Sequence, residues 1–231
     1  MTTTTNRIRI LTALLTTSIM LAPAALANLL VDPGFEANPL TTTANVLSNF
    51  PGFQGVWGPE VGTITGIDNG VTPAQGAKML RMDDDGNVTT QGFQTTDVSS
   101  YAGAIDAGSA SLTLSALFNV DAQVPAAVGG VYIQFFSASN YGSQIGAGLA
   151  GTLSLDNSVN TWETAFVNTP IPVGTRWLLS QVYYSNASLI GNDGAIHPGY
   201  VDASDLRVVP EPASIGLVAI GAMALLRRRI A

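Results

Sequence analysis

The chain has 231 residues, contains no cysteine and carries a formal net charge of −7. The lack of cysteine excludes disulfides, cysteine nucleophiles and thiolate metal sites. Five of the nine basic residues lie near the two ends, so residues 28–207 hold fifteen acidic residues and only four basic ones. A net charge of about −11 repels phosphate backbones and argues against nucleic acid as a partner.

The N-terminus has the three parts of a secretory signal peptide. A start with two arginines precedes an apolar stretch, residues 10–21, which four hydroxyl residues interrupt. Ala25 and Ala27 then fit the small-x-small cleavage pattern. We therefore expect export through the Sec machinery and removal of residues 1–27 by signal peptidase, with Asn28 as the first mature residue. The alternative is an uncleaved N-terminal helix.

Short apolar runs follow, separated by clusters of Gly, Pro, Asn, Asp and Thr, and no long stretch has helical periodicity. The clearest strand is residues 111–120, where alternate residues are apolar. Glycine-rich residues 141–151 fit a loop as well as a weak strand. This pattern predicts one all-β domain over residues 28–207, an antiparallel β-sandwich. The further predicted strands are 61–67, 78–82, 131–136, 161–167, 176–184 and 200–209.

Two stretches resemble jelly-roll carbohydrate-binding modules of the galactose-binding-like type. NLLVDPGFEANP (residues 28–39) resembles their first strand and turn, and YVDASDLRVV (residues 200–209) resembles their last strand. The resemblance implies a jelly-roll sandwich and a polysaccharide ligand. It also implies a structural calcium beside the first and last strands, where Glu36 and Asp202 match the acidic positions. The alternative is that Glu36 only caps or pairs locally.

A sugar-binding surface needs an aromatic face for the sugar ring, with amides or carboxylates for its hydroxyl groups. The three tryptophans are candidates, although a tryptophan in a sandwich commonly belongs to the core. Period-two alternation places Tyr132 and Gln134 on one face of a strand, and Trp177, Gln181 and Tyr183 on one face of another. If the two faces coincide, these five side chains form a platform for carbohydrate.

The sequence contains no recognisable catalytic motif. The acidic run MDDDGN (residues 82–87) is followed by Val88 and Gln94 at the positions where an EF-hand loop requires its sixth-position glycine and twelfth-position glutamate, so the run fits a solvated turn. His197, the only histidine, lies in a predicted loop without a serine-elbow motif elsewhere. We expect a non-catalytic protein. The alternative is a small polysaccharide-active enzyme, a glycosidase or lyase, which uses carboxylates that are distant in sequence.

The tail ends the chain with two prolines, an apolar stretch and three arginines. Residues 213–226 would form a helix of about 21 Å, short for a hydrocarbon core of about 30 Å. The prolines keep the preceding segment extended and accessible. The positive-inside rule places the arginines on the cytoplasmic side, so the domain faces outward. These arginines are Arg227, Arg228 and Arg229.

The order Pro-Glu-Pro, apolar stretch and arginine cluster in residues 208–231 resembles the PEP-CTERM sorting signal of exported bacterial proteins. The resemblance implies recognition and cleavage by the membrane protease exosortase, in a host that makes extracellular polysaccharide. We expect an exported protein that is membrane-anchored at least transiently and then resides at the cell surface or in the extracellular matrix. A plain single-span anchor is the alternative. The implied recognition residues are Pro210, Glu211 and Pro212.

Overall fold

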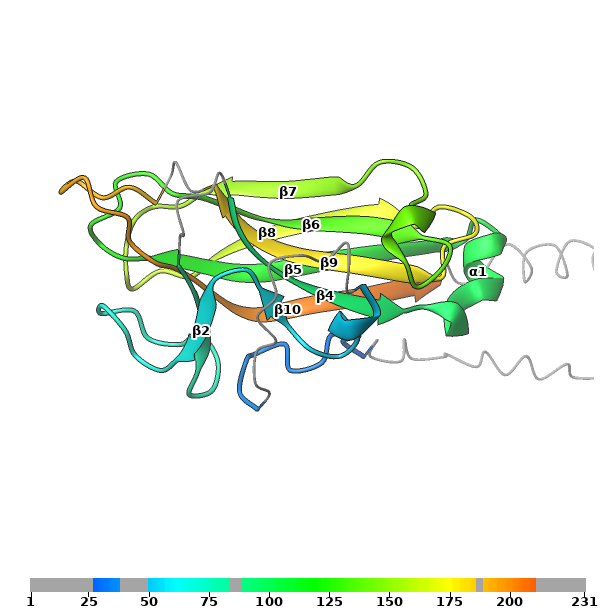
Figure 1. Cartoon of the computed structure of the whole chain (residues 1–231), viewed down its shortest axis with the longest axis horizontal. Coiled ribbons are helices and arrows are strands. Elements are labelled where there is room, and N and C mark those ends of the chain that lie inside the picture. Colours follow the sequence, from blue (N-terminus) through cyan, green and yellow to red (C-terminus); the bar gives the residue numbers. More distant parts are fainter. Residues whose placement is uncertain (1–26, 38–49, 84–88, 186–188, 211–231) are drawn as a thin grey trace, which may run out of the picture.

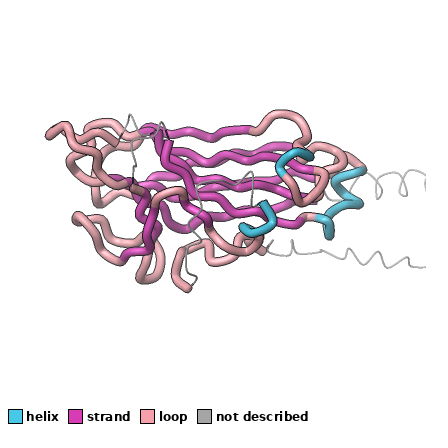
Figure 2. Tube along the Cα trace, viewed as in Figure 1, coloured by secondary structure: helices cyan, strands magenta, loops and turns pink. Residues whose placement is uncertain are grey.

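The computed structural model describes residues 27–37, 50–83, 89–185 and 189–210. They form two five-stranded antiparallel sheets packed face to face (Figure 1, Figure 2). This confirms the predicted antiparallel β-sandwich. The expected signal peptide and the apolar stretch 213–226 lie outside these ranges, apart from Ala27. Within the ranges, no helix has the length and apolar character needed to cross a bilayer.

Both sheets place a long strand at their centre and short strands at one edge. The first sheet has the order β1 (Gly58–Pro59), β4 (Thr89–Asp97), β9 (Trp177–Ser185), β6 (Val128–Phe136) and β7 (Leu149–Ser154). The second has the order β2 (Gly62–Thr65), β3 (Met79–Met82), β10 (Gly199–Pro210), β5 (Ala110–Val120) and β8 (Glu163–Pro170). Short helices lie in the connections: η1 (Phe50–Phe53), η2 (Ser99–Tyr101), α1 (Ala102–Asp106) and η3 (Tyr141–Ser143).

From β3 onward, every connection except β6–β7 passes from one sheet to the other. The core between the sheets therefore combines alternate residues of both, such as Leu114 and Phe118 of β5 with Ile133 of β6. Tyr184 of β9 links the sheets directly, because its hydroxyl lies 2.8 Å from the Asn119 carbonyl and 2.7 Å from the Tyr200 carbonyl. Complete burial raises the pKa of this phenol well above its usual range.

The N-terminal segment of the domain lies along β10. The Leu29 amide donates to the Leu206 carbonyl at 2.8 Å, and the Ser204 amide donates to the Pro33 carbonyl at 2.8 Å. The Asn28 side chain donates to Ser204 and accepts from the Leu206 amide. A register shift in β10 between residues 202 and 205 accompanies this docking. The described fold thus starts its contacts at Asn28, the residue that the sequence predicts to be the first mature one.

At the other terminus, β10 continues past Arg207, where the sequence analysis placed the end of the domain. Val208 is only 1% exposed and belongs to the core. Val209 pairs with Ser111 and Pro210 pairs with Ala110. The sandwich therefore extends to Pro210, because these residues complete the pairing of β10 with β5.

Candidate functional site

The two predicted strand faces coincide on the outer surface of the first sheet. β6 pairs with β9, which sets Tyr132 directly opposite Gln181 and Tyr183 opposite Gly130. Their neighbours Val131, Ile133 and Val182 point into the core, so the polar residues point away from it. The pairing brings Tyr132, Gln181 and Tyr183 together as the alternation predicted.

Gln134 and Trp177 lie on the same face, where Gln134 is buried and Trp177 is half-buried. Trp177 packs against Phe50 of η1, with ring centroids 6.2 Å apart. Gln134 is only 6% exposed, and its amide donates to the Tyr141 hydroxyl at 3.4 Å. Gly148 crosses so closely over this side chain that a Cβ on it would lie 2.9 Å from the Gln134 Cγ. Gln134 is therefore not available on this surface, whereas Trp177 keeps part of its side chain exposed beside η1.

The other two tryptophans are also used structurally. Trp57 is 2% exposed, packs on Phe35 with ring centroids 5.2 Å apart, and donates from Nε1 to the Asp32 carbonyl. Trp162 donates from Nε1 to the Thr72 carbonyl at 2.9 Å and packs against a satellite cluster around Tyr200. Of the three tryptophans, only the half-buried Trp177 thus lies with Tyr132 and Tyr183 on the outer face of the first sheet.

Two polar residues that the sequence analysis missed complete this surface. Gln181 donates from Nε2 to the Gln91 Oε1 at 2.6 Å, and Gln91 donates from Nε2 to the Glu60 Oε1 at 2.6 Å. The hydrogen bonds hold both amides in place beside the tyrosines. We name the set Glu60, Gln91, Tyr132, Gln181 and Tyr183 the polar strip. Gln91 was missed because β4 itself was not predicted.

Glycines allow both tyrosines of the polar strip to lean over the sheet. A Cβ on Gly130 would lie 2.9 Å from the Tyr183 Cζ and hydroxyl, so this phenol lies directly over the glycine. A Cβ on Gly148 would likewise lie 2.2 Å from the Tyr132 hydroxyl. Partial burial raises the pKa of Tyr183. The Tyr183 phenol thus lies over β6, and the Tyr132 phenol lies against the segment that directly precedes β7.

A separate open hollow of about 420 Å³ lies beside the C-terminal end of β4. Thr96 lines it and carries a buried Oγ1 that has no hydrogen-bond partner in the described part of the chain. None of the described residues that line the hollow is aromatic, so it offers no ring face for a sugar. These residues are Leu29, Val31, Gln54, Gly55, Gln94, Thr95, Thr96 and Asp97.

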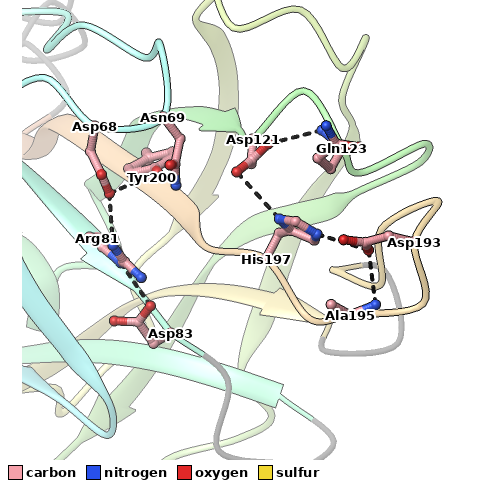
Figure 3. A network of polar contacts seen from close by, with 10 residues as sticks. All are labelled: Asp68, Asn69, Arg81, Asp83, Asp121, Gln123, Asp193, Ala195, His197 and Tyr200. Carbon is pink, nitrogen blue, oxygen red and sulfur yellow. Dashed lines mark hydrogen bonds and ion pairs between the residues drawn. The ribbon is translucent and has the colours of Figure 1, made fainter.

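His197 lies in a polar network at the end of the sandwich opposite α1 (Figure 1, Figure 3). Its Nδ1 is 3.3 Å from the Asp121 Oδ2 and its Nε2 is 3.1 Å from the Asp193 Oδ1. The hydrogen bond to Asp193 and the neighbouring Asp121 raise the pKa of His197. In its protonated form His197 can donate from both ring nitrogens to these carboxylates, and the imidazolium then has no lone pair to act as a base. His197 therefore joins two loops, and at 16% side-chain exposure it is more enclosed than a surface loop residue.

This arrangement predicts a pH-dependent contribution to stability. Because the pKa of His197 is raised in the folded protein, its ion pairs contribute fully below the unfolded value of about 6.5 and are lost as the pH rises through the folded pKa. His197→Gln should abolish this part of the pH dependence of the melting temperature. Thermal melts of both proteins from pH 5.5 to 8.5 check this prediction. If the melting temperatures of the two proteins change in parallel with pH, the ion pairs of His197 contribute nothing to the pH dependence.

Arg81 organises the second half of the network (Figure 3). Its Nη1 is 2.9 Å from the Asp68 Oδ2 and its Nε is 2.8 Å from the Asp83 Oδ1. The Tyr200 hydroxyl donates to the same Asp68 oxygen at 3.0 Å. Asp83, the first aspartate of the acidic run, is thus engaged with an arginine, and residues 84–88 of that run lie outside the described residues.

Glu36 and Asp202 both accept hydrogen bonds from backbone amides of the segment that precedes β3. Glu36 Oε1 accepts from the Ala77 and Lys78 amides, and the buried Asp202 accepts from the Gln75 and Ala203 amides. Burial raises the pKa of Asp202, and the negative charge of Glu36 adds to this effect. Among the described residues, no three acidic or histidine side chains converge as a metal cage. Calcium binding at Glu36 and Asp202 therefore stays a prediction. It depends on two carboxylates that repel each other and whose oxygens keep lone pairs with which to bind a cation.

Several residues of the predicted processing sites lie outside the described ranges. For the sorting signal, the structure places Pro210 at the end of β10 and describes nothing beyond it. For the signal peptide, it describes Ala27 and Asn28 only. The predicted residues outside the description are Ala25, Glu211, Pro212, Arg227, Arg228 and Arg229.

The described fold and the tail together define a β-sandwich module with a C-terminal sorting signal. Residues 208–230 match the PEP-CTERM protein-sorting motif. The chain thus carries this motif, as its tail predicted, and the motif marks it as an exported protein. No curated protein matches the chain.

The fold is similar to that of several solved structures at low identity. TmCBM61, solved with β-1,4-galactotriose, is 13% identical, with a TM-score of 0.47 over 80% of this chain and 99% of that one. A putative sugar-binding protein from Bacteroides thetaiotaomicron is 12% identical, with a TM-score of 0.47 over 78% of this chain and 99% of that one. The CBM22-2 xylan-binding domain of Paenibacillus barcinonensis Xyn10C is 14% identical, with a TM-score of 0.45 over 66% of this chain and 91% of that one.

Proposed function

We propose that this exported protein binds extracellular polysaccharide through the polar strip, without catalysis. The observation that carries the proposal is the combination of two leaning phenols with a hydrogen-bonded row of two amides and one carboxylate on an open sheet face. The phenol rings offer apolar faces to the C–H side of a pyranose. The amides and Glu60 offer donors and acceptors for its hydroxyl groups.

Three features of the polar strip and its surroundings favour binding over hydrolysis. Glycosidases use two carboxyl groups that flank the scissile bond, whereas the polar strip contains one, Glu60. Glu60 is also engaged with Gln91, which fixes it as a hydrogen-bonding group. His197 is held between two carboxylates at the end of the sandwich and does not belong to the strip.

We further propose that exosortase acts on the tail and delivers the domain to the cell surface or the extracellular matrix. The two prolines and Glu211 supply the extended recognition segment, and the apolar stretch with its arginines holds the substrate in the membrane. Polysaccharide binding at the destination would then retain the domain in the matrix after the tail is removed.

The test is affinity electrophoresis of residues 28–210 through gels that contain β-1,4-galactan, xylan or extracellular polysaccharide from the producing bacterium. The fragment ends at Pro210 because shortening it to Arg207 would remove Val208 from the core. We expect retardation in at least one gel, with no reducing sugar released on prolonged incubation. If the fragment migrates at the same rate in every gel as in a gel without polysaccharide, the proposal that the domain binds polysaccharide is wrong. Release of reducing ends would favour the enzyme alternative.

We propose that calcium binds between Glu36 and Asp202 and stabilises the junction of the N-terminal segment with β10. Because the pKa of Asp202 is raised, its ionised form costs stability at neutral pH when no cation is present, and this cost disappears on acidification. A bound cation should reverse the trend. At a calcium concentration a hundredfold above Kd, the stabilisation would be about 2.7 kcal/mol.

The corresponding measurement is thermal unfolding at neutral pH with calcium or with chelator. We expect a higher melting temperature in calcium, and no calcium-dependent shift in the Asp202→Asn variant. Asp97→Asn, an exposed carboxylate on β4, serves as the control and should keep the shift. Equal melting temperatures in calcium and chelator for the unmodified domain would exclude this site.

A further inference from the structure

The last strand of the sandwich runs directly into the sorting motif. β10 pairs with β5 as far as Pro210, and Val208 is buried in the core. The matched motif starts at residue 208, so its first three residues belong to the folded domain. No linker separates the domain from the tail.

This connection limits how far the domain can lie from a membrane that holds the tail. Glu211 and Pro212 alone separate Pro210 from Ala213, where the apolar stretch begins. Three residue steps span at most about 11 Å. The headgroup region on each side of the hydrocarbon core is roughly 5–8 Å thick. Pro210 must therefore lie at or just above the headgroups, unless Val208 is pulled out of the core.

The surface around Pro210 is the end of the sandwich that carries α1 (Figure 1). Ala110 pairs with Pro210 and accepts a hydrogen bond from the Ile171 amide at 2.9 Å. The loop that follows Ile171 exposes Val173 at 60%. We name this surface the α1 end and define it as residues 98–109, 137–144, 171–176 and 210.

Charge is distributed unevenly between the two ends of the sandwich. In the α1 end as defined, the charged side chains are Asp106 and Arg176, which pair at 2.7 Å and cancel. Directly beside it, the exposed Asp97 accepts from the Ser99 amide and adds one negative charge. Acidic side chains gather instead near the opposite end, where Arg81 and His197 balance only part of the charge. With this single uncompensated charge, the α1 end meets less repulsion from an anionic lipid surface than the acidic end would meet. The acidic residues there are Asp68, Asp83, Asp121, Asp156, Glu163 and Asp193.

We propose that the α1 end is a membrane-contacting surface, held against the lipid headgroups for as long as the tail is inserted. Val173 then lies at the lipid surface, and the acidic end points away from it. The polar strip lies on the flank of the sandwich and stays open to solvent. This inference rests on the proposed insertion of the tail.

Because the chain has no cysteine, single cysteines give unique labelling sites. The chain from Asn28 to Ala231 would be reconstituted in vesicles of phosphatidylethanolamine and phosphatidylglycerol with spin-labelled headgroups. A fluorophore is attached at Val173→Cys in the α1 end, or at Ala122→Cys, an exposed position near the acidic end. Ala219→Cys in the tail reports insertion in vesicles with spin-labelled acyl chains.

We expect several-fold stronger headgroup quenching at position 173 than at position 122, together with acyl-chain quenching at position 219. A Gly/Ser spacer of about twenty residues after Pro210, with a span of roughly 25 Å, should reduce quenching at 173 to the level at 122. Quenching at 219 with equal, weak signals at 173 and 122 would overturn the orientation and leave tail insertion standing. Absence of acyl-chain quenching at position 219 would overturn both the tail insertion and the orientation of the α1 end. Polysaccharide binding is tested separately, by affinity electrophoresis.

Discussion

Tyr183→Ala should weaken polysaccharide binding at least tenfold, about 1.4 kcal/mol, in affinity electrophoresis. The substitution removes the phenol that leans over Gly130 at the centre of the polar strip, and truncated aromatic anchors commonly dominate the energy of an interface. Tyr183 is half-buried on an outer face, so the fold should persist and the circular dichroism spectrum should not change. Tyr183→Phe keeps the ring and should retain most of the affinity.

The chain offers a matched aromatic control on the opposite sheet. Phe166 of β8 is 62% exposed on the outer face of the second sheet. Phe166→Ala removes a comparable exposed ring and should leave the retardation unchanged. If Phe166→Ala weakens binding and Tyr183→Ala does not, the carbohydrate site lies on the second sheet and the polar strip is not the binding surface.

Gly199→Ala should destabilise the domain by about 1–3 kcal/mol, as expected for overpacking in a core. A Cβ at this position would lie 2.5 Å from the Tyr184 Cε2 and 2.7 Å from its Cδ2 and Cζ. The ring cannot withdraw easily, because Gly129 packs on it from the other side and its hydroxyl bonds two carbonyls. Moving the ring would break the hydrogen bonds that join β9 to β5 and β10.

Urea denaturation of residues 28–210, followed by tryptophan fluorescence, measures this effect. Gly103→Ala is the matched control, since a Cβ there meets nothing within 4 Å and the residue lies in α1. It should be neutral or stabilise the domain by roughly 0.5–1 kcal/mol, through helix propensity. Denaturation midpoints that agree for the two variants would refute a special packing role for Gly199.

Strands whose inward residues are apolar were predictable from sequence. β5 buries Leu112, Leu114 and Phe118 at alternate positions, and its predicted range differs from the observed one by one residue. β4 shows the opposite case, because its sequence TTQGFQTTD fills buried positions with Thr90, Gln94 and Thr96. The Gln94 amide pairs with the backbone of Val31, sixty-three residues away, so no local pattern reveals the strand. The ambiguous glycine-rich stretch 141–151 holds η3 and the start of β7.

The candidate site was predictable only where it follows local alternation. Tyr132, Gln181 and Tyr183 were found because they repeat every second residue on two strands. That Gln134 would be buried depends on the segment around Gly148, and the packing of Trp177 depends on Phe50 of η1, which is distant in sequence. Gln91 enters the strip through the pairing of β4 with β9, and Glu60 enters it beside the pairing of β1 with β4. No sequence spacing encodes these contacts.

The continuity of β10 with the tail also has a mechanical consequence. A pull on Pro210 acts along β10, a strand that pairs with β5 at ten positions and with β3 at three more. Force in this direction loads the hydrogen bonds between β10 and its two neighbouring strands in shear, so many bonds share the force and must break together. A terminal strand at a sheet edge, or a hairpin pulled from its open end, would unzip bond by bond. If the proposed insertion of the tail and the proposed polysaccharide binding hold, the domain would carry tension between the membrane and the bound polymer through this strand.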